Sequence, residues 1–338
     1  MENLNLVNLI QAGIITVGIL GGTLLWLTKT KEFRGISALL FCSSFSACIN
    51  ILEESGLTRD LYLISPVFIM LFGPVIYLAA KLLIEKKLTI IQSLHLLPIF
   101  PFLFFTSYTH IVIGLGTIWR LVYALLTILM LLKYKRSLDD ERSDSDDFSL
   151  NWLIWILGVT SVFNLIDLLR LNIQQTIPFS LNLLGQGVNN AVWLVAAMII
   201  IIKLQLVSKI PTKADSADDP SDNTTDAYNS IFEELDDLIK SNQWFLKPRL
   251  TLSDVSHLTG LQTRDISRAI NIVTDKSFNE YVNNYRVGFV CALLEKNTQK
   301  SLTDIYADAG FSSKASFNKV FKQITGATPS EFKSRNNV

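Results

Sequence analysis

The most apolar part of the chain contains a small set of polar side chains at helical spacing. Arg120 is the only charge in the run 111–132, and Asn164, Asp167 and Arg170 follow one another at intervals of three residues. Charged groups in so apolar a context normally face the interior of a helix bundle or water, and they find a partner there. The residues expected to line a sensor pocket are Arg120, Asn164, Asp167, Gln186 and Asn189.

Three chemistries fit these side chains. Arg120 and Asp167 can form an ion pair within a polar pocket that faces the outside of a membrane. Asp167 and Arg170 can instead neutralise each other. The amides can also form hydrogen bonds between helices, at about 0.6 kcal/mol per pair, and bind no ligand.

The histidines and cysteines show no spacing typical of catalysis or metal binding. His95, His110 and His257 lie far apart, and the three cysteines form neither a disulfide framework nor a zinc motif. The chain contains no phosphate-binding loop, Gly-x-Ser-x-Gly, His-Glu-x-x-His or kinase signature. We therefore expect no enzyme activity, no metal and no cofactor.

The elements that carry the polar residues are predicted to be membrane spans. The chain has 338 residues, of which 49% are hydrophobic and 18% charged, whereas soluble proteins carry about 25% charged residues. The excess of apolar residues lies in the first two thirds, where uncharged runs are long enough to cross about 30 Å of hydrocarbon. Seven spans are predicted, near residues 6–27, 36–52, 61–84, 88–107, 111–132, 150–170 and 178–206.

Lysine and arginine in the loops predict the orientation of these spans. Basic residues gather in alternate loops, at 29–34, 86–87 and 133–142, while the other loops hold few. Because cytoplasmic loops carry the excess of Lys and Arg, the N-terminus is predicted outside and everything after residue 206 in the cytoplasm.

Charge also divides the rest of the chain. Residues 207–230 lack apolar periodicity and hold five acidic and two basic residues, which predicts an acidic flexible linker. Residues 244–338 hold 13 Lys and Arg against 8 Asp and Glu. We therefore expect a membrane domain over 1–206, a linker over 207–230 and a basic domain over 231–338.

The basic domain contains an internal repeat. The segment LSDVSHLTGL (252–261) resembles LTDIYADAGF (302–311) at an offset of fifty residues. Each unit predicts a short amphipathic helix, a glycine turn and a longer helix, which is helix-turn-helix geometry. Gly260 and Gly310 stand where the first helix must end in a left-handed residue. An apolar stripe within 231–242 predicts a further helix that covers this domain or contacts a partner.

The residues of the second repeat resemble a known protein family. The stretch GFSSKASFNKVFKQITGATPSEFK (310–333) resembles the signature of AraC/XylS-type bacterial transcription regulators, and ISRAINIVTDKSFNEYVNNYRVGFV (266–290) resembles their first recognition helix and joining helix. Two positions depart from the family pattern. Asp275 stands where glycine is usual, and we expect the turn to survive because Asp tolerates the left-handed conformation. Tyr306 replaces a small alanine, so the local packing must differ.

The resemblance implies contacts to double-stranded promoter DNA from the start of each second helix. This is the part of such a helix that enters the major groove, where Arg and Lys reach guanine. Hydroxyls at the helix starts can cap free amides beside a phosphate. The residues implied are Thr263, Arg264, Ser267 and Arg268 in the first unit and Ser313, Lys314, Ala315, Ser316 and Lys319 in the second.

Together these features predict an all-α protein: a seven-helix transmembrane bundle followed by a soluble AraC-type domain with two helix-turn-helix units. The expected function is a one-component transcription regulator in the bacterial inner membrane. Its expected partners are promoter DNA, RNA polymerase (implied by the family), the lipid bilayer, an unknown small-molecule or membrane signal, and a second copy in a homodimer. A transporter-like solute-binding protein with a regulatory head, or a head that binds proteins, are the alternatives.

Overall fold

The computed structural model describes residues 6–28, 30–58, 62–106, 108–148, 150–173, 176–206, 225–296 and 301–336. These residues form α-helices and short 3-10 helices, and no strand occurs among them. The prediction of an all-α protein is therefore confirmed over the described residues.

The chain divides into two compact units. The first, which we call the apolar unit, comprises Met1–Leu132 and Leu150–Thr212. The second, the C-terminal unit, comprises Lys133–Ser149 and Lys213–Val338. This division differs from the predicted boundaries, because residues 133–149, which lie between two predicted spans, group with the C-terminal unit.

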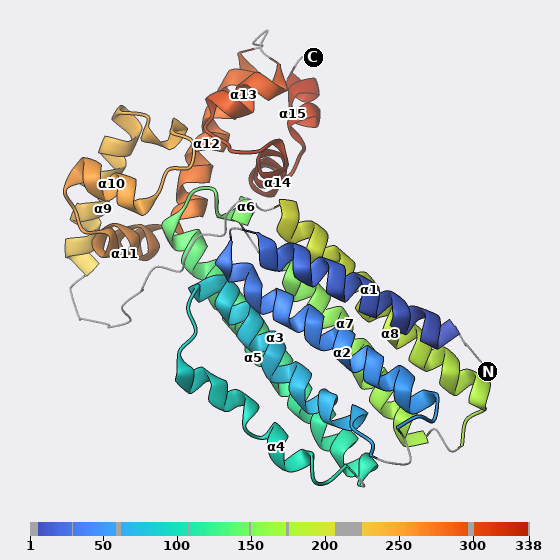
Figure 1. The fold of residues 1–338 in the computed structure, drawn as a ribbon. Helices are drawn as coiled ribbons and strands as arrows, with labels where there is room; N and C mark the ends of the chain where they lie inside the picture. Colours follow the sequence, from blue (N-terminus) through green and yellow to red (C-terminus); the bar gives the residue numbers. More distant parts are fainter. Residues whose placement is uncertain are drawn as a thin grey trace. The chain divides into compact units, whose positions relative to one another are not determined.

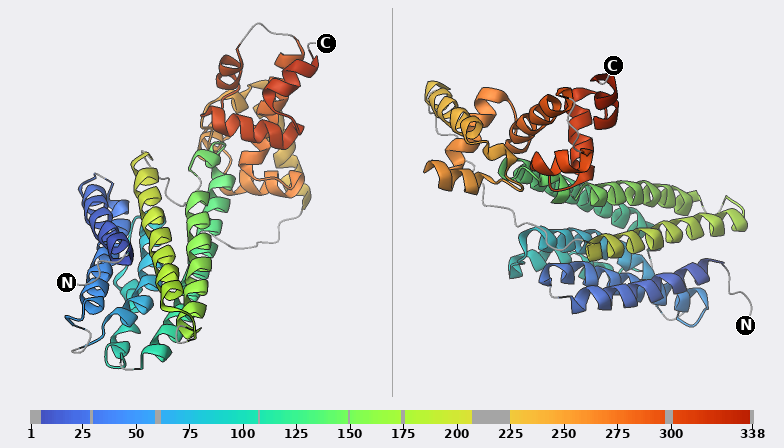
Figure 2. Two further views of the ribbon diagram at one scale, coloured as in Figure 1. Left: turned by 90° about the vertical axis from the view of Figure 1, so that its right-hand side faces the viewer. Right: turned by 90° about the horizontal axis from the view of Figure 1, so that it is seen from above.

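Six helices in the described part of the apolar unit are long and apolar enough to cross a membrane. Figures 1 and 2 show them running side by side along the unit. The helices are α1 (Leu6–Leu27), α2 (Arg34–Glu54, preceded by the 3-10 turn η1, Lys31–Phe33), α3 (Ser65–Glu85), α5 (Thr109–Glu141), α7 (Asn151–Ile173) and α8 (Phe179–Leu206). They correspond to six of the seven predicted spans.

The fourth predicted span, 88–107, is not a long helix. It forms the 3-10 helix η2 (Ile90–Leu96) and the single turn α4 (Ile99–Phe102). Pro98 and Pro101 interrupt it, because proline removes a backbone donor and clashes with the preceding turn. Figure 1 shows this segment running the length of the helices from the end of α3 to the start of α5. The count of seven helices is therefore replaced by six long helices and one broken segment.

Small residues set the close approach of helices in the apolar unit. A Cβ on Gly18 of α1 would lie 2.8 Å from the carbonyl oxygen of Leu40 in α2. A Cβ on Gly73 of α3 would lie 3.2 Å from the Cα of Arg120 in α5. Glycine at these places allows the backbones to meet closely, as is typical of helix packing in membranes.

The C-terminal unit contains seven helices of more than one turn after residue 224 in its described part. They are α9 (Thr225–Ser241), α10 (Leu252–Thr259), α11 (Thr263–Thr274), α12 (Phe278–Glu295), α13 (Leu302–Asp308), α14 (Lys314–Thr325) and α15 (Pro329–Asn336). The 3-10 turn η3 (Trp244–Leu246) follows α9, and α6 (Ser145–Phe148) belongs to the earlier segment of this unit. Most of the predicted linker, residues 207–224, lies outside the described residues, and α9 begins within its last part.

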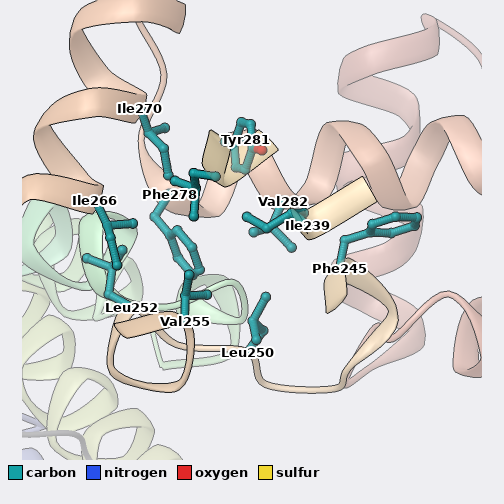
Figure 3. Close-up of a cluster of buried hydrophobic side chains, with 11 residues drawn as sticks. Ile239, Phe245, Leu250, Leu252, Val255, Ile266, Ile270, Phe278, Tyr281 and Val282 are labelled. Atoms are coloured by element: carbon teal, nitrogen blue, oxygen red, sulfur yellow. The ribbon is translucent and has the colours of Figure 1, made fainter. Parts of the chain in front are cut away.

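Two hydrophobic cores hold the C-terminal unit together, and α12 contributes to both. Phe278, Tyr281 and Val282 pack in the first core with Leu235, Ile239, Phe245, Leu250, Leu252, Val255, Ile266 and Ile270 (Figure 3). Val287, Val290 and Leu294 pack in the second core with Ile305, Ala309, Phe311, Phe317, Val320 and Phe321. The long helix α12 therefore joins the two helix pairs as a shared rigid element.

The apolar stripe of α9 covers the first core. Leu235 and Ile239 are fully buried there. Asp236, on the same helix, accepts hydrogen bonds from the hydroxyls of Tyr281 (2.7 Å) and Tyr285 of α12 and pairs with Lys240. Burial opposes ionisation of Asp236, but the hydrogen bonds from Lys240, Tyr285 and Tyr281 outweigh it and lower the pKa of this carboxyl. Of the two predicted roles for this stripe, the structure shows the covering role.

Candidate nucleic-acid interface and buried polar cavity

The first helix pair, α10 and α11, is built by local capping. Thr251 caps α10 by accepting a hydrogen bond from the amide of Asp254, whose carboxylate binds back to the Thr251 amide at 2.9 Å. Gly260 ends α10 with a left-handed φ of 74°. Asp275 ends α11 in the same conformation, with φ 51°. The predictions for both turns are confirmed.

The predicted contact residues of this pair lie at the start of α11. Thr263 and Arg264 are exposed, and Ser267 and Arg268 are half-buried. The guanidinium of Arg268 donates from Nη1 to the hydroxyl of Tyr228 in α9 at 3.4 Å. Thr263 is not the cap of α11, since Gln262 precedes the helix without a capping side-chain hydrogen bond. Arg264 and Arg268 lie one turn apart on the side of α11 opposite the buried Ile266 and Ile270, whereas Thr263 and Ser267 flank that buried face.

The second helix pair, α13 and α14, repeats this arrangement. Ser313 caps α14 by accepting from the amide of Ser316 at 3.1 Å, as predicted for a hydroxyl at a helix start. Lys314, Ala315 and Lys319 are exposed. Ser316, however, is buried. The prediction of a base contact from Ser316 disagrees with this burial, because its side chain packs under the surface that the neighbouring lysines occupy.

Packing between the two helices adapts to the unusual Tyr306. Its ring stacks on Phe317 of α14, with centroids 5.8 Å apart and planes inclined by 25°. Gly310, between the helices, has a left-handed φ of 80°, and a Cβ there would lie 2.5 Å from the carbonyl oxygen of Leu246. The turn therefore requires glycine both for its conformation and for this close approach.

The five residues predicted for a sensor pocket all line one cavity of about 310 Å³ in the apolar unit. They come from α5 (Arg120), α7 (Asn164 and Asp167) and α8 (Gln186 and Asn189). The predicted ion pair between Arg120 and Asp167 is not formed. Asp167 accepts from Nε of Arg170 at 2.8 Å instead, because the two lie one turn apart on α7.

Other polar groups of the cavity have partners within the bundle. Asn164 accepts from the indole Nε1 of Trp193 at 3.3 Å. Gln186 donates to Glu54, at the end of α2, at 2.6 Å, and Glu54 also accepts from Asn8 and Gln11 of α1. Glu54 was not among the predicted residues, since its place in a predicted loop gave no indication that it would meet amides from two other helices.

Comparison with known proteins bears on the C-terminal unit. Residues 255–335 match the family described as Helix-turn-helix domain. The chain is 28% identical over 105 residues to YkgA, an HTH-type transcriptional regulator by name, of Escherichia coli (strain K12), covering 31% of this chain and 42% of that protein. It is 27% identical over 86 residues to the regulatory protein SoxS of Salmonella typhimurium, covering 25% of this chain and 79% of that protein. The C-terminal part of this chain is an AraC-type helix-turn-helix domain.

The family match runs from within α10 to within α15. It includes the second core and part of the first, whose members Leu235, Ile239, Phe245, Leu250 and Leu252 lie before the matched residues. No solved structure matches the chain. The apolar unit lies outside the matched residues, and its helices are characterised by length and composition alone.

The AraC-type domain also incorporates a segment from between two long apolar helices. Residues 142–145, which follow α5, are grouped with the C-terminal unit, and Ser143, Asp144 and Ser145 are buried. The amide of Ser143 donates to the carbonyl oxygen of Leu250 at 3.0 Å. The backbones of Arg142 and Thr251 form an isolated antiparallel β-bridge. Sequence reasoning missed this docked segment, because its acidic and hydroxyl residues resemble an ordinary solvated loop.

Arg286 of α12 is the centre of this contact. Its side chain is 1% exposed and donates to the carbonyl oxygens of Phe245 (2.7 Å) and Lys247 (2.9 Å) as well as to Ser143. Burial lowers the pKa of the Arg286 guanidinium to about 10, while the nearby carboxylate of Asp144 acts to raise it. The group therefore stays charged at neutral pH, and Asp144 is the acid that compensates it.

Proposed function

We propose that this protein is a membrane-embedded transcription regulator in which one polypeptide senses a signal and binds promoter DNA. The AraC-type domain carries the proposal, because the same domain occurs in relatives named as regulators. Six apolar helices in the described residues support an integral membrane location. A protein of this kind needs no separate phosphorelay, since input and output share one chain.

DNA is contacted by the two helix pairs, acting as two helix-turn-helix units. Arg264 and Lys314, both exposed at the start of the second helix of a pair, are the residues best placed for base edges. The proposed contact surface continues on α11 with Ser267 and Arg268 and on α14 with Ala315 and Lys319. A DNA phosphate meets the start of each helix, at Thr263 and at Ser313. Since α12 joins the two helix pairs rigidly, the pairs occupy successive major grooves of the DNA, about 34 Å apart.

The start of α14 supports a phosphate contact. The N-terminus of a helix offers free amides and a favourable dipole to an anion. A DNA phosphate at this place satisfies these free amides. Ser316, being buried, stays out of the proposed base contacts.

The AraC-type domain lies in the cytoplasm in this proposal, and the N-terminus lies outside the inner membrane of a bacterium. The basic residues at 31–34, 86–87 and 133–136 all belong to the cytoplasmic side by the positive-inside rule. The broken segment from α3 to α5 runs the length of the bundle, which keeps this alternation (Figure 1). RNA polymerase and a second copy of the chain are the proposed protein partners.

DNA capture by the full-length protein tests this proposal. The chain, in lipid nanodiscs, is mixed with sheared genomic DNA from its source, and bound fragments are sequenced. We expect enrichment of a few promoter regions, with affinity that falls steeply with salt. Arg264→Ala is expected to weaken binding to those fragments about tenfold or more, since a good base contact contributes about 1–3 kcal/mol.

Lys276→Ala is the matched control, because Lys276 is an exposed cation beyond the other end of α11. Equal weakening by both substitutions contradicts the assignment of α11 as a recognition helix. Binding to no fragment at any salt concentration favours the alternative in which the head binds proteins. Flux of a solute across vesicles that hold the protein favours the transporter alternative.

A further inference from the structure

The cavity in the apolar unit has room for a small organic molecule. Its volume of about 310 Å³ lies at the lower end of the range for small-molecule sites. Residues of α1, α2, α3, α5, α7 and α8 all contribute to its walls, and most of these are apolar, such as Phe68, Phe72 and Ile200. The cavity therefore lies among all six long helices of the described part of the unit.

Arg120 brings a positive charge into this cavity, and no acid among the described residues forms a direct ion pair with it, although Asp167 lies close enough to act on it electrostatically. Its Nε is buried and has no hydrogen-bond partner among the described residues. The guanidinium carbon lies 5.8 Å from the centre of the Trp193 ring, which stacks in turn on Phe72. Asp167, the acid of the cavity wall, is already engaged by Arg170 at 2.8 Å. A buried guanidinium of this kind favours an anion that it can bind through two parallel hydrogen bonds.

A second polar group near the charge is also unsatisfied. The side-chain oxygen of Asn189, another lining residue, is buried without a hydrogen-bond partner among the described residues. Buried polar groups are costly unless they are hydrogen-bonded. The cavity therefore lacks an acceptor for the Arg120 Nε–H and a donor for the Asn189 oxygen, and a carboxylate supplies the first of these. The apolar part of the wall, which includes Phe68, Phe72 and Ile200, suits a hydrocarbon or aromatic body.

We propose that this cavity binds a small carboxylate with an apolar body. The carboxylate pairs with Arg120, and the apolar part lies against Phe68, Phe72 and Ile200. The proposal rests on the sensing role given above to the apolar unit and names the class of molecule sensed. Occupancy satisfies Arg120 and brings α5 and α8 to one ligand, since Arg120 belongs to α5 and Ile200 to α8.

Calorimetric titration of the full chain in phosphatidylcholine nanodiscs tests the proposal, with empty nanodiscs as the blank. The probes are octanoate, octanamide of the same length without the charge, and octyl phosphate. We expect octanoate to bind at least about tenfold more tightly than octanamide, as the loss of a charge-assisted hydrogen bond predicts. Arg120→Gln removes this preference, and Arg120→Lys, which keeps the charge, restores part of it.

Lys203→Gln, an exposed cation of α8 outside the cavity wall, is the matched control and keeps the preference. Equal binding of octanoate and octanamide, or unchanged octanoate binding by Arg120→Gln, overturns the proposal. Tighter binding of octyl phosphate than of octanoate overturns the carboxylate class in favour of a phosphate headgroup. The assay contains no DNA, so its failure is distinct from a failure of the proposed DNA binding.

A second inference rests on the docked segment. Helix α5 is continuous from Thr109 to Glu141, and the residues that follow it at once are held by the AraC-type domain. The side-chain amides of Asn279 and Asn283 donate to the carbonyl oxygens of Arg142 (3.3 Å) and Ser143 (3.4 Å). We infer that this segment couples α5, which carries Arg120, to the helix pair α10–α11 through Leu250, Thr251 and α12.

Coupling of this kind is reciprocal, so DNA binding must alter α5. Hydrogen exchange is measured on the full chain in nanodiscs with and without a promoter fragment that it binds. We expect changed exchange in the last turns of α5 and at Ser143. Insertion of Gly-Ser-Gly between Glu141 and Arg142 is expected to abolish the change in α5 while DNA affinity stays within about twofold.

Exchange in α5 that ignores bound DNA in the unaltered chain overturns this inference. A change that survives the insertion also overturns it, because the docked segment is then not the connection. Absence of DNA binding is a different result, which contradicts the proposed function itself.

Discussion

The guanidinium of Arg286 donates to both oxygen atoms of Ser143, from Nη1 to the carbonyl at 3.3 Å and from Nη2 to the hydroxyl at 3.1 Å. The two residues are 143 positions apart in the chain. One belongs to the joining helix α12, and the other belongs to the segment that follows the long apolar helix α5. An AraC-type domain in this chain is therefore completed by residues from the N-terminal half of the sequence.

Asp144→Ala should destabilise the C-terminal unit. The Asp144 side chain is 2% exposed, pairs with Arg142 at 2.9 Å and compensates the buried Arg286. Loss of one partner from a buried charged pair typically costs about 3–5 kcal/mol. Urea-dependent proteolysis of the full chain, read on fragments from residues 225–336, measures the effect. Asp237→Ala, an exposed acid of α9, is the control and should change stability little.

The contact of Asp236 with Tyr281 and Tyr285 should make the C-terminal unit sensitive to acid. The folded pKa of Asp236 lies below the ordinary carboxyl value of about 3.9. The stabilisation is therefore present above that ordinary value and is lost as the pH falls through the folded pKa. Asp236→Asn should be less stable than the unaltered chain at pH 7, and the difference should vanish in the acid range. A difference that stays constant down to pH 2 contradicts the assignment.

Gly260 and Gly310, two of the glycines with left-handed φ, offer a matched pair. Gly260→Ala meets open space and carries only the conformational cost of φ 74°, about 1 kcal/mol. Gly310→Ala carries the same cost and also brings a Cβ to 2.5 Å from the backbone of Leu246. We expect the second substitution to lower the melting temperature clearly more than the first. Equal effects mean that the turn before α14 can relax.

A similar pair tests the packing of the apolar unit. Gly18→Ala places a Cβ 2.8 Å from the backbone oxygen of Leu40 and should weaken the contact of α1 with α2. Gly158→Ala in α7 meets nothing within 4 Å and should leave stability unchanged or slightly raise it. Thermal aggregation of the full chain in detergent compares the two variants.

Local patterns were sufficient to predict much of the fold. Uncharged runs located the six long helices, and the repeated pattern of Leu, Asp and Gly located both helix pairs with their turns at Gly260 and Gly310. The Asp275 turn followed from the known tolerance of Asp for left-handed backbone. Five of the polar residues that line the cavity are predictable from the sequence because polar groups are rare in so apolar a context.

Features that depend on tertiary contact were not predictable. Asp167 can pair with either Arg120 or Arg170, and the choice depends on how α5 and α7 are rotated about their axes. The spacing of residues along the sequence does not specify this rotation. The sequence pattern predicts Ser316 as a surface hydroxyl, but its side chain is buried, and burial depends on how α14 packs against its neighbours. The docking of Ser143 on Arg286 joins residues far apart in sequence, and nothing in a short acidic loop indicates such a partner.

Recovery of DNA by the chain carried in membranes tests the central claim most directly. Membranes that hold the chain are washed, solubilised into nanodiscs and exposed to sheared genomic DNA, in parallel with membranes that hold the Arg264→Ala, Lys319→Ala double variant. We predict that the unaltered protein stays in the membrane fraction and enriches discrete promoter fragments, and that the variant loses this enrichment while inserting equally. Protein found in the soluble fraction, or equal recovery of DNA by both forms, would contradict the account.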